Sequence, residues 1–289
     1  MCQLCVKKHM KNLIWTALAI ITVFSSCKND QKTTKKIVPE RVQPIEIGYS
    51  FEKSNKWFNA NQQSGKNLKL VMALNRMDES NLVKADSILI PTDFSGDIAY
   101  YMPFPLKVSS LEEINKIILF SYKTQSFAAY ENGVLTYVGP TSLGREKDKT
   151  PTGLFFTNWK AEQTTSTFND EWELKWNFNI ANKLGIGFHQ YELPGYPASH
   201  SCLRLLESDA KLLYSWADQW VLENDQKVKL KGTPVIVFGE YDFEGAKPWL
   251  QLKENPDALK ISESEINDLI EPYLVKVKEA QTKRENSKV

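Results

Sequence analysis

The first pattern along the chain is a short apolar run behind a basic start. Residues 13–24 are apolar apart from two threonines, and Lys7, Lys8 and Lys11 precede them without an acidic residue. A helix that crosses the hydrocarbon core of a membrane needs about 20 apolar residues. The run is too short for that, and residues 1–26 are therefore predicted to be a secretory signal peptide.

The next two regions are a polar linker and a small region of mixed pattern. Residues 27–44 are polar and rich in lysine, which predicts a solvated tether without regular structure. Within residues 45–110, the apolar run 70–74 ends at Asn75, and a second run over 86–91 closes with Ile-Pro, which predicts a short helix followed by a strand. This arrangement resembles the second half of a lysin-motif glycan-binding module. The alternative is an ordinary accessory α+β region.

From residue 115 to 240 the hydrophobic pattern changes to that of strands. Short apolar and aromatic runs cover 117–122, 127–130, 134–138, 154–159 and 233–240. Asn132-Gly133 separates two of these runs, and this pair favours the positive φ angles of a type I′ hairpin turn. The pattern predicts a domain that is mainly β, with helices beside it.

Two helical patterns flank these strands. Ser208-Asp209-Ala210 opens the first, in which Ala210, Leu213, Ala217 and Trp220 share one face. The second lies in the extension 241–289, where Ser262 and Glu265 have the spacing of a capping box and Ile261 and Ile266 flank it. This helix is expected to kink or restart at Pro272. Its apolar residues Ile266, Leu269, Ile270 and Tyr273 are expected to pack on the β domain.

The positions of the cysteines predict how the protein is anchored and which thiol stays free. The polar segment begins with Ser25-Ser26-Cys27, which resembles the lipobox of bacterial lipoproteins and implies lipidation of Cys27 and a membrane anchor; the alternative is an ordinary cleavage site with an incidental thiol. Cys2 and Cys5 lie in the predicted signal, so Cys202 is expected to be the one free thiol of the mature protein. An exported, anchored protein of this kind faces the periplasm in the cell envelope.

Charge excludes one class of partner. Removing residues 1–26 takes three lysines from 36 basic residues and nothing from 35 acidic residues, which leaves a net charge of −2. Nucleic-acid binding therefore has no electrostatic support.

The histidines gather around the predicted free thiol. Beyond the signal the chain has only His189 and His200, and both lie within fourteen residues of Cys202. An imidazole beside a thiol can take its proton and yield a nucleophilic thiolate at neutral pH. The alternatives are a buried structural cysteine with two structural histidines, or a metal site, for which two histidines and one cysteine with only Glu192 nearby are a poor ligand set.

The residues around Cys202 resemble the catalytic signature of the L,D-transpeptidases. They read Ser199-His200-Ser201-Cys202-Leu203-Arg204, with His189 upstream, and a glycine at Gly144 and the turn Thr150-Pro151-Thr152-Gly153 precede them in the family's order. The resemblance covers about residues 115–240. It implies a mostly antiparallel β-sandwich in which Cys202 attacks peptide stems of bacterial peptidoglycan. A thioester forms, D-alanine leaves, and a second stem resolves the thioester, with no metal or other cofactor.

The resemblance also implies roles for single residues. His189 is the expected base, although His200 would lie on the same side of an extended strand as Cys202 and could replace it. Arg204 is expected to bind a substrate carboxylate, or alternatively to form a structural ion pair. Gly144, Ser199 and Ser201 are expected to line the substrate site.

Two departures from the family pattern concern the geometry of the site. Ser201 stands where glycine is usual, and a positive φ there would cost energy. The interval between His189 and Cys202 is short, and the compact turn Pro194-Gly195-Tyr196-Pro197 is expected to join their strands. Besides transpeptidation, hydrolysis of the same acyl-enzyme and a non-catalytic envelope protein remain open.

Overall fold

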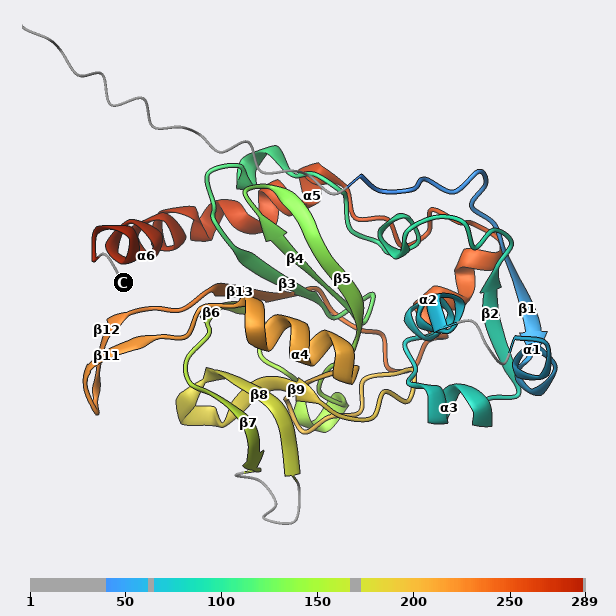
Figure 1. The fold of residues 1–289 in the computed structure, drawn as a ribbon, viewed down its shortest axis with the longest axis horizontal. Helices are drawn as coiled ribbons and strands as arrows, with labels where there is room; N and C mark the ends of the chain where they lie inside the picture. Colours follow the sequence, from blue (N-terminus) through green and yellow to red (C-terminus); the bar gives the residue numbers. More distant parts are fainter. Residues whose placement is uncertain (1–39, 62–64, 167–172, 288–289) are drawn as a thin grey trace, which may run out of the picture. The chain divides into compact units, whose positions relative to one another are not determined.

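The computed structural model describes residues 40–61, 65–166 and 173–287 (Figure 1). The predicted signal, Cys27 and most of the tether lie outside these residues. The described residues all belong to one unit of the chain, which extends from residue 39 to 289. Within the described ranges, no helix has both the length and the apolar character needed to cross a membrane.

The first part of this unit, here called the N-terminal lobe, is a two-stranded sheet whose strands are joined by three helices. Strands β1 and β2 pair antiparallel, from Tyr49 opposite Pro91 to Lys53 opposite Ser87. The predicted helix and strand of this lobe are confirmed. The elements are β1 (Tyr49–Lys53), α1 (Ser54–Ala60), α2 (Gly65–Asn75), α3 (Glu79–Lys84) and β2 (Ser87–Pro91).

Asn75 connects α2 to β2. Its amide nitrogen donates to the carbonyls of Val71 and Leu89, both at 2.9 Å, and its amide oxygen accepts from the Leu89 N–H at 2.8 Å. The side chain is buried, so these bonds satisfy polar groups that water cannot reach. One residue thus fixes where the helix ends and how the strand lies against it.

A nine-stranded sheet forms the second part, in the order β6-β13-β3-β4-β5-β10-β9-β8-β7. The mainly β class expected from the sequence is confirmed, as one continuous sheet that curls over. Its strands are β3 (Ile117–Ser121), β4 (Ser126–Glu131), β5 (Val134–Ser142), β6 (Gly153–Phe156), β7 (Lys160–Thr165), β8 (Glu173–Ala181), β9 (Ile186–Gln190), β10 (Leu203–Leu205) and β13 (Pro234–Phe238). A separate hairpin consists of β11 (Val221–Asn224) and β12 (Lys227–Leu230).

The predicted hairpin at Asn132-Gly133 is confirmed. Both residues have positive φ, 50° and 75°, and Glu131 pairs with Val134 across the turn. These are the angles of the turn that matches the twist of antiparallel strands. The hairpin starts β5, whose far end pairs with β10, where Ser142 lies opposite Arg204.

A hydrophobic core fills the space between the two halves of the curled sheet. Phe120 from one half meets Phe188 from the other, with ring centroids 6.2 Å apart. Phe127 packs beside Phe120 and Phe178 beside Phe188, at 5.8 and 5.3 Å. Helix α4 (Glu207–Trp216) packs into the same core through Ala210 and Leu213. The helix is shorter than expected, because it ends before Trp220.

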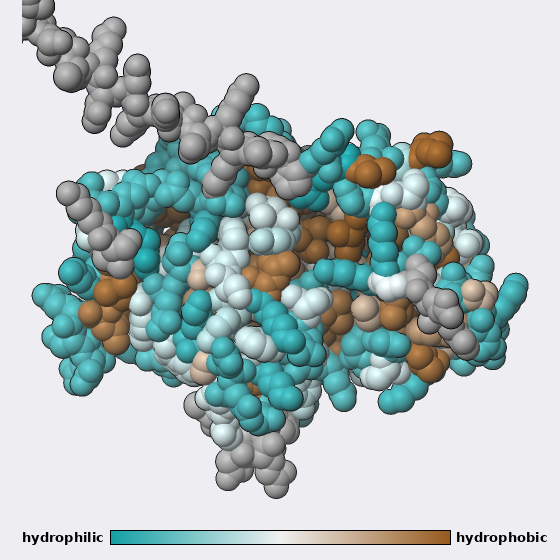
Figure 2. All heavy atoms as spheres, in the orientation of Figure 1, coloured by the Kyte–Doolittle hydropathy of each residue, from teal (hydrophilic) through white to brown (hydrophobic). Residues whose placement is uncertain are grey.

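Hydrophilic residues cover most of the face drawn in Figure 2.

The C-terminal extension packs on the opposite face of the sheet. The capping box is present, since Ser262 Oγ accepts from the Glu265 N–H and Glu265 accepts from the Ser262 N–H. Ile266 and Ile270 are fully buried against Ile117 and Leu119, as expected. The extension comprises η5 (Pro248–Lys253), α5 (Glu263–Ile270), η6 (Glu271–Tyr273) and α6 (Leu274–Asn286), so the helix does restart at Pro272.

Four further 3₁₀ turns link these elements. They are η1 (Ile98–Tyr100), η2 (Ser109–Leu111), η3 (Glu146–Asp148) and η4 (Asn182–Leu184).

The connection between β9 and β10 differs from the expectation. The two strands are parallel, with Leu203 opposite Phe188 and Arg204 opposite His189, so a compact turn cannot join them. Residues 191–202 instead run out to the N-terminal lobe, where Pro194 bridges to Met77 and Leu193 hydrogen-bonds to Asp78. Gly195 does turn the chain with φ 80°. The predicted compact turn between the strands is wrong, because the connection is a crossover.

Candidate active site

Cys202 lies at the end of this crossover, directly before β10. The β9–β10 register continues from the Leu203–Phe188 pair, which brings Cys202 beside Gly187. Its Sγ is 3.9 Å from the Gly185 carbonyl oxygen, and the residue keeps partial solvent exposure. Burial raises the pKa of the Cys202 thiol, whereas the Gly187 N–H and the Arg204 charge act to lower it.

His189 lies on β9, opposite Arg204 on β10. It is 3% exposed, and its Nδ1 is 2.9 Å from the Gln190 carbonyl oxygen. A carbonyl can only accept, so this contact assigns the proton to Nδ1 and leaves Nε2 as the basic nitrogen. Burial lowers the pKa of His189 to about 4, with the Arg204 charge acting in the same direction.

These two pKa directions correct one expectation from the sequence. Burial opposes the charged form of both groups, so the thiol and the imidazole are each neutral at pH 7 in the free protein. The thiolate at neutral pH that the sequence predicted is therefore not favoured. A neutral imidazole is nevertheless the form that can accept a proton.

The charge of Arg204 acts on the pKa of both Cys202 and His189. Its guanidinium lies 4.4 Å above the Tyr191 ring and donates to the Glu192 carbonyl at 3.5 Å. Within the described ranges no carboxylate forms an ion pair with it, so the structural ion pair considered from the sequence is not observed there. The cation remains available for a ligand.

His200 lies away from the position expected for it. Ser201 has φ 77° and residues 200–202 form a bend, so the extended strand that would put His200 and Cys202 on one side is absent. His200 Nε2 contacts the Arg145 guanidinium, which has no acceptor, so Nε2 must accept there. Arg145 Nε in turn binds Asp148 at 2.5 Å. The basic nitrogen of His200 is thus occupied, and burial together with Arg145 lowers its pKa.

The loop that carries Cys202 is held by a network of short-range bonds. Ser199 Oγ donates to the Cys202 carbonyl at 2.5 Å, and the Ser199 backbone bridges to Gly144. Thr150 Oγ1 accepts from the Gly144 N–H and donates to the Ser201 carbonyl, both at 2.9 Å. A Cβ at Gly144 would lie 2.2 Å from the Asp148 carbonyl oxygen, so only glycine fits.

Ser201 is one of the few residues other than glycine with a left-handed backbone. This conformation costs an L-residue about 1–2 kcal/mol, and the Ser201 hydroxyl donates to the Asp148 carbonyl at 3.1 Å. The concern raised by a serine at the usual glycine position is therefore confirmed. Among the described residues, the N–H groups of Ser201 and Cys202 donate no hydrogen bond to a backbone carbonyl.

Sequence reasoning missed Arg145, Asp148 and Tyr191 as parts of this site. Arg145 and Asp148 lie between two predicted landmarks, Gly144 and Thr150, and that position was the available signal. Tyr191 lacked any signal, because its contact with Arg204 depends on the parallel strand pairing. No group of three or more potential metal ligands occurs among the described residues.

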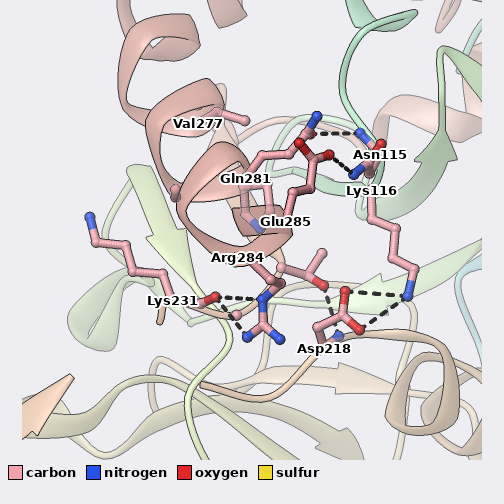
Figure 3. Close-up of a pocket in the computed structure, with 12 residues that line it drawn as sticks. Asn115, Lys116, Asp218, Lys231, Val277, Gln281, Arg284 and Glu285 are labelled. Carbon is pink, nitrogen blue, oxygen red and sulfur yellow. Dashed lines mark hydrogen bonds and ion pairs between the residues drawn. The ribbon is translucent and has the colours of Figure 1, made fainter. Parts of the chain in front are cut away.

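Two cavities help to place this site within the fold. One of about 340 Å³ is lined by the Thr150 turn together with Tyr122, Lys149, Tyr241 and Phe243. Another of about 220 Å³ lies between α6 and the sheet, where Arg284 and Asp218 are found (Figure 3). The second cavity has none of the predicted catalytic residues in its lining.

Solved structures similar to this chain carry the names of L,D-transpeptidases. One from Stackebrandtia nassauensis is 24% identical with a TM-score of 0.36, over 44% of this chain and 57% of that one. Two from Mycobacterium tuberculosis are each 20% identical, with TM-scores of 0.35 and 0.34. They are matched over 44% of this chain and 58% and 61% of theirs. The chain thus spans less than two thirds of each. Comparison with curated proteins gave no match.

The family comparison matches the region that contains every residue of the site. The model of the YkuD L,D-transpeptidase catalytic domain aligns with residues 115–237. This range begins just before β3 and ends in β13, so it covers the nine-stranded sheet, α4 and the loop of Cys202. Residues 115–237 of this chain therefore match the L,D-transpeptidase catalytic-domain family.

Proposed function

We propose that this protein cross-links peptidoglycan through a thioester on Cys202. The observation that carries the proposal is the grouping of a thiol directly before β10, a neutral imidazole on β9 and a guanidinium on β10 that forms no ion pair with a described carboxylate, inside the region that matches the catalytic domain. Cys202 Sγ attacks the carbonyl that links the diamino acid at stem position three to D-alanine at position four. The C–N bond breaks, D-alanine leaves as an amine, and the stem stays on sulfur as a thioester.

His189 moves the protons in both steps. Its Nε2 takes the thiol proton as sulfur attacks and gives it to the departing D-alanine nitrogen. The thiol and the imidazole are both neutral in the free protein. The proton therefore moves from Cys202 to His189 only when substrate is bound. In the second step an amine of another stem attacks the thioester, His189 takes its proton, and the thiol is restored with a 3→3 cross-link.

The backbone of the Cys202 loop stabilises the oxyanion. The N–H groups of Ser201 and Cys202 are directed by the left-handed Ser201 and are not used elsewhere in the described backbone. A donor of this kind is typically worth about 3 kcal/mol. Ser199, Gly144 and Thr150 keep the loop in place, and Arg204 binds a carboxylate of the stem.

Mass spectrometry of the intact protein tests the thioester. Incubation with a tetrapeptide-stem muropeptide or a carbapenem is expected to add the mass of the acyl group to the wild type, but not to Cys202→Ala. Lys84→Met, a change at an exposed residue of the N-terminal lobe, is a control that keeps the nucleophile and its loop. An unmodified wild type with both reagents, and no released D-alanine, would refute the thioester.

We also propose that the protein is exported and anchored through a lipid on Cys27. The support is the sequence order of basic start, short apolar run, small residues and cysteine, followed by a polar tether. Such an anchor would hold the catalytic domain beside the wall on the periplasmic side. Labelling with radioactive palmitate should mark the protein, and Cys27→Ala should lose the label; a label that survives this change would disprove lipidation at Cys27.

The N-terminal lobe is proposed to bind glycan strands. Its antiparallel β1 and β2, joined by helices, suit the resemblance to a lysin-motif module. Residues 45–110 should sediment with purified peptidoglycan. If they stay in the supernatant while the whole chain sediments, the glycan contact lies elsewhere.

A further inference from the structure

Arg76, far from Cys202 in sequence, is a buried cation that forms no ion pair with any described residue. It follows the end of α2, is 1% exposed and has φ 57°. Nε donates to the Thr124 carbonyl at 2.8 Å, and Nη1 donates to the carbonyls of Ala73 and Leu74 at 2.6 and 3.0 Å. These contacts tie the N-terminal lobe to the turn between β3 and β4.

The Nη2 nitrogen of the Arg76 guanidinium makes no hydrogen bond in the described part of the chain. Nη2 is buried, and no described carboxylate forms an ion pair with Arg76. The remaining neighbour of the charge is the ring of Trp249 in η5, with its centroid 5.4 Å from the guanidinium carbon. Burying an unpaired ion costs several kcal/mol, so a further partner for Nη2 is expected.

A small cavity adjoins this group. Arg76, Tyr49, Tyr101 and Lys260 contribute to its lining, together with apolar residues such as Leu252 and Leu259. The cavity has a volume of about 10 Å³, which is about the minimum that one water-sized occupant needs. Of the two charged lining residues, Lys260 is compensated by an ion pair of 2.7 Å with Asp257, so the positive charge at the cavity is that of Arg76. The cavity therefore combines a positive potential with room for one small occupant.

We infer that this cavity binds a single halide-sized anion, chloride in ordinary salt, with Arg76 Nη2 as its main ligand and the Tyr49 hydroxyl as a second donor. A water molecule would satisfy the N–H but would leave the charge uncompensated, whereas an anion does both. The apolar walls strengthen the attraction, because they lower the local dielectric. Since Arg76 joins α2, the β3–β4 turn and η5, the anion would reinforce the contact between the N-terminal lobe and the catalytic sheet.

Halide dependence of thermal unfolding tests this site in the purified whole protein. At constant ionic strength, replacing sodium gluconate by sodium chloride up to about 0.3 M should raise Tm by about 3 °C, because the anion binds only the folded state. Arg76→Met should lose this dependence. Lys84→Met removes an exposed cation of the same lobe and should keep it.

A second variant and a direct observation cover the case in which Arg76→Met does not fold. Tyr49→Phe keeps the ring and should require a several-fold higher chloride concentration for the same rise in Tm. Crystals soaked in sodium bromide should show an anomalous peak within hydrogen-bond distance of Arg76 Nη2. A wild-type Tm that is equal in the two salts, or bromide-soaked crystals without a peak in this cavity, would overturn the inference.

Discussion

At the scale of single residues, burial controls the chemistry of the site. Cys202 and His189 both lose solvation in the fold, so the charged form of each is disfavoured. The sequence predicted a site in this segment from the spacing of the two residues and from the residues around them, and the structure places His189 on β9 and Cys202 directly before the neighbouring β10. The sequence could not predict their protonation states, since these depend on which strands cover them.

The pH dependence of stability follows from His189. Its pKa is about 4 in the folded protein and about 6.5 when unfolded. The unfolded chain therefore binds more protons between these values, so His189 contributes stability above pH 6.5 that is lost as the pH falls towards 4. Between pH 7 and 4.5 this loss is expected to be about 2 kcal/mol.

Urea unfolding followed by tryptophan fluorescence measures this effect. His189→Gln should remove the loss, so that its curve falls less steeply than the wild-type curve in this pH range. His200→Gln should reduce the loss by a smaller amount, because the lowered pKa of His200 belongs to a more exposed ring. Equal pH dependence of His189→Gln and the wild type would show that the imidazole is not buried in its neutral form.

Backbone strain at Ser201 gives a second residue-level prediction. Ser201→Ala loses the bond to the Asp148 carbonyl and keeps the left-handed φ, whereas Ser201→Gly loses the bond and relieves the φ. Glycine is therefore expected to be more stable than alanine at this position by about 1 kcal/mol in free energy of unfolding. An alanine variant as stable as the glycine variant would mean that the loop adopts a different backbone in solution.

At the scale of elements, local signals predicted structure well and long-range pairing was missed. The Asn132-Gly133 hairpin and the Ser262 capping box are set by residues within a few positions of each other, and both are present. The parallel pairing of β9 with β10 depends on residues 191–202 crossing to Met77 and Asp78. No signal within that segment specifies such a partner, so a simple turn was expected instead.

Asn75 provides the test at this scale. Asn75→Ala removes three buried hydrogen bonds and leaves the Leu89 N–H and C=O without this partner. The free energy of unfolding is expected to fall by about 2–3 kcal/mol. Asn61→Ala is the matched control, because it removes one half-buried bond to the Trp57 carbonyl and should cost well under half as much. Similar losses in the two variants would show that Asn75 does not connect α2 to β2.

At the scale of the whole molecule, the catalytic sheet and the N-terminal lobe meet at the segments that build the site. The crossover before Cys202 contacts the lobe at Met77, and Lys69 on α2 forms an ion pair of 3.1 Å with the buried Asp209 of α4. Sequence patterns could not show these contacts, because they join residues far apart in the chain. A lobe that binds glycan would therefore hold the stem peptide near Cys202.

The products made from purified sacculi test the central claim most directly. Sacculi rich in tetrapeptide stems are incubated with the enzyme, digested to muropeptides and analysed by mass spectrometry. The wild type is expected to produce 3→3 cross-linked dimers together with free D-alanine, and Cys202→Ala should produce neither. Release of D-alanine without any dimer would contradict transpeptidation and indicate hydrolysis of the thioester, and unchanged muropeptides would contradict catalysis by Cys202 altogether.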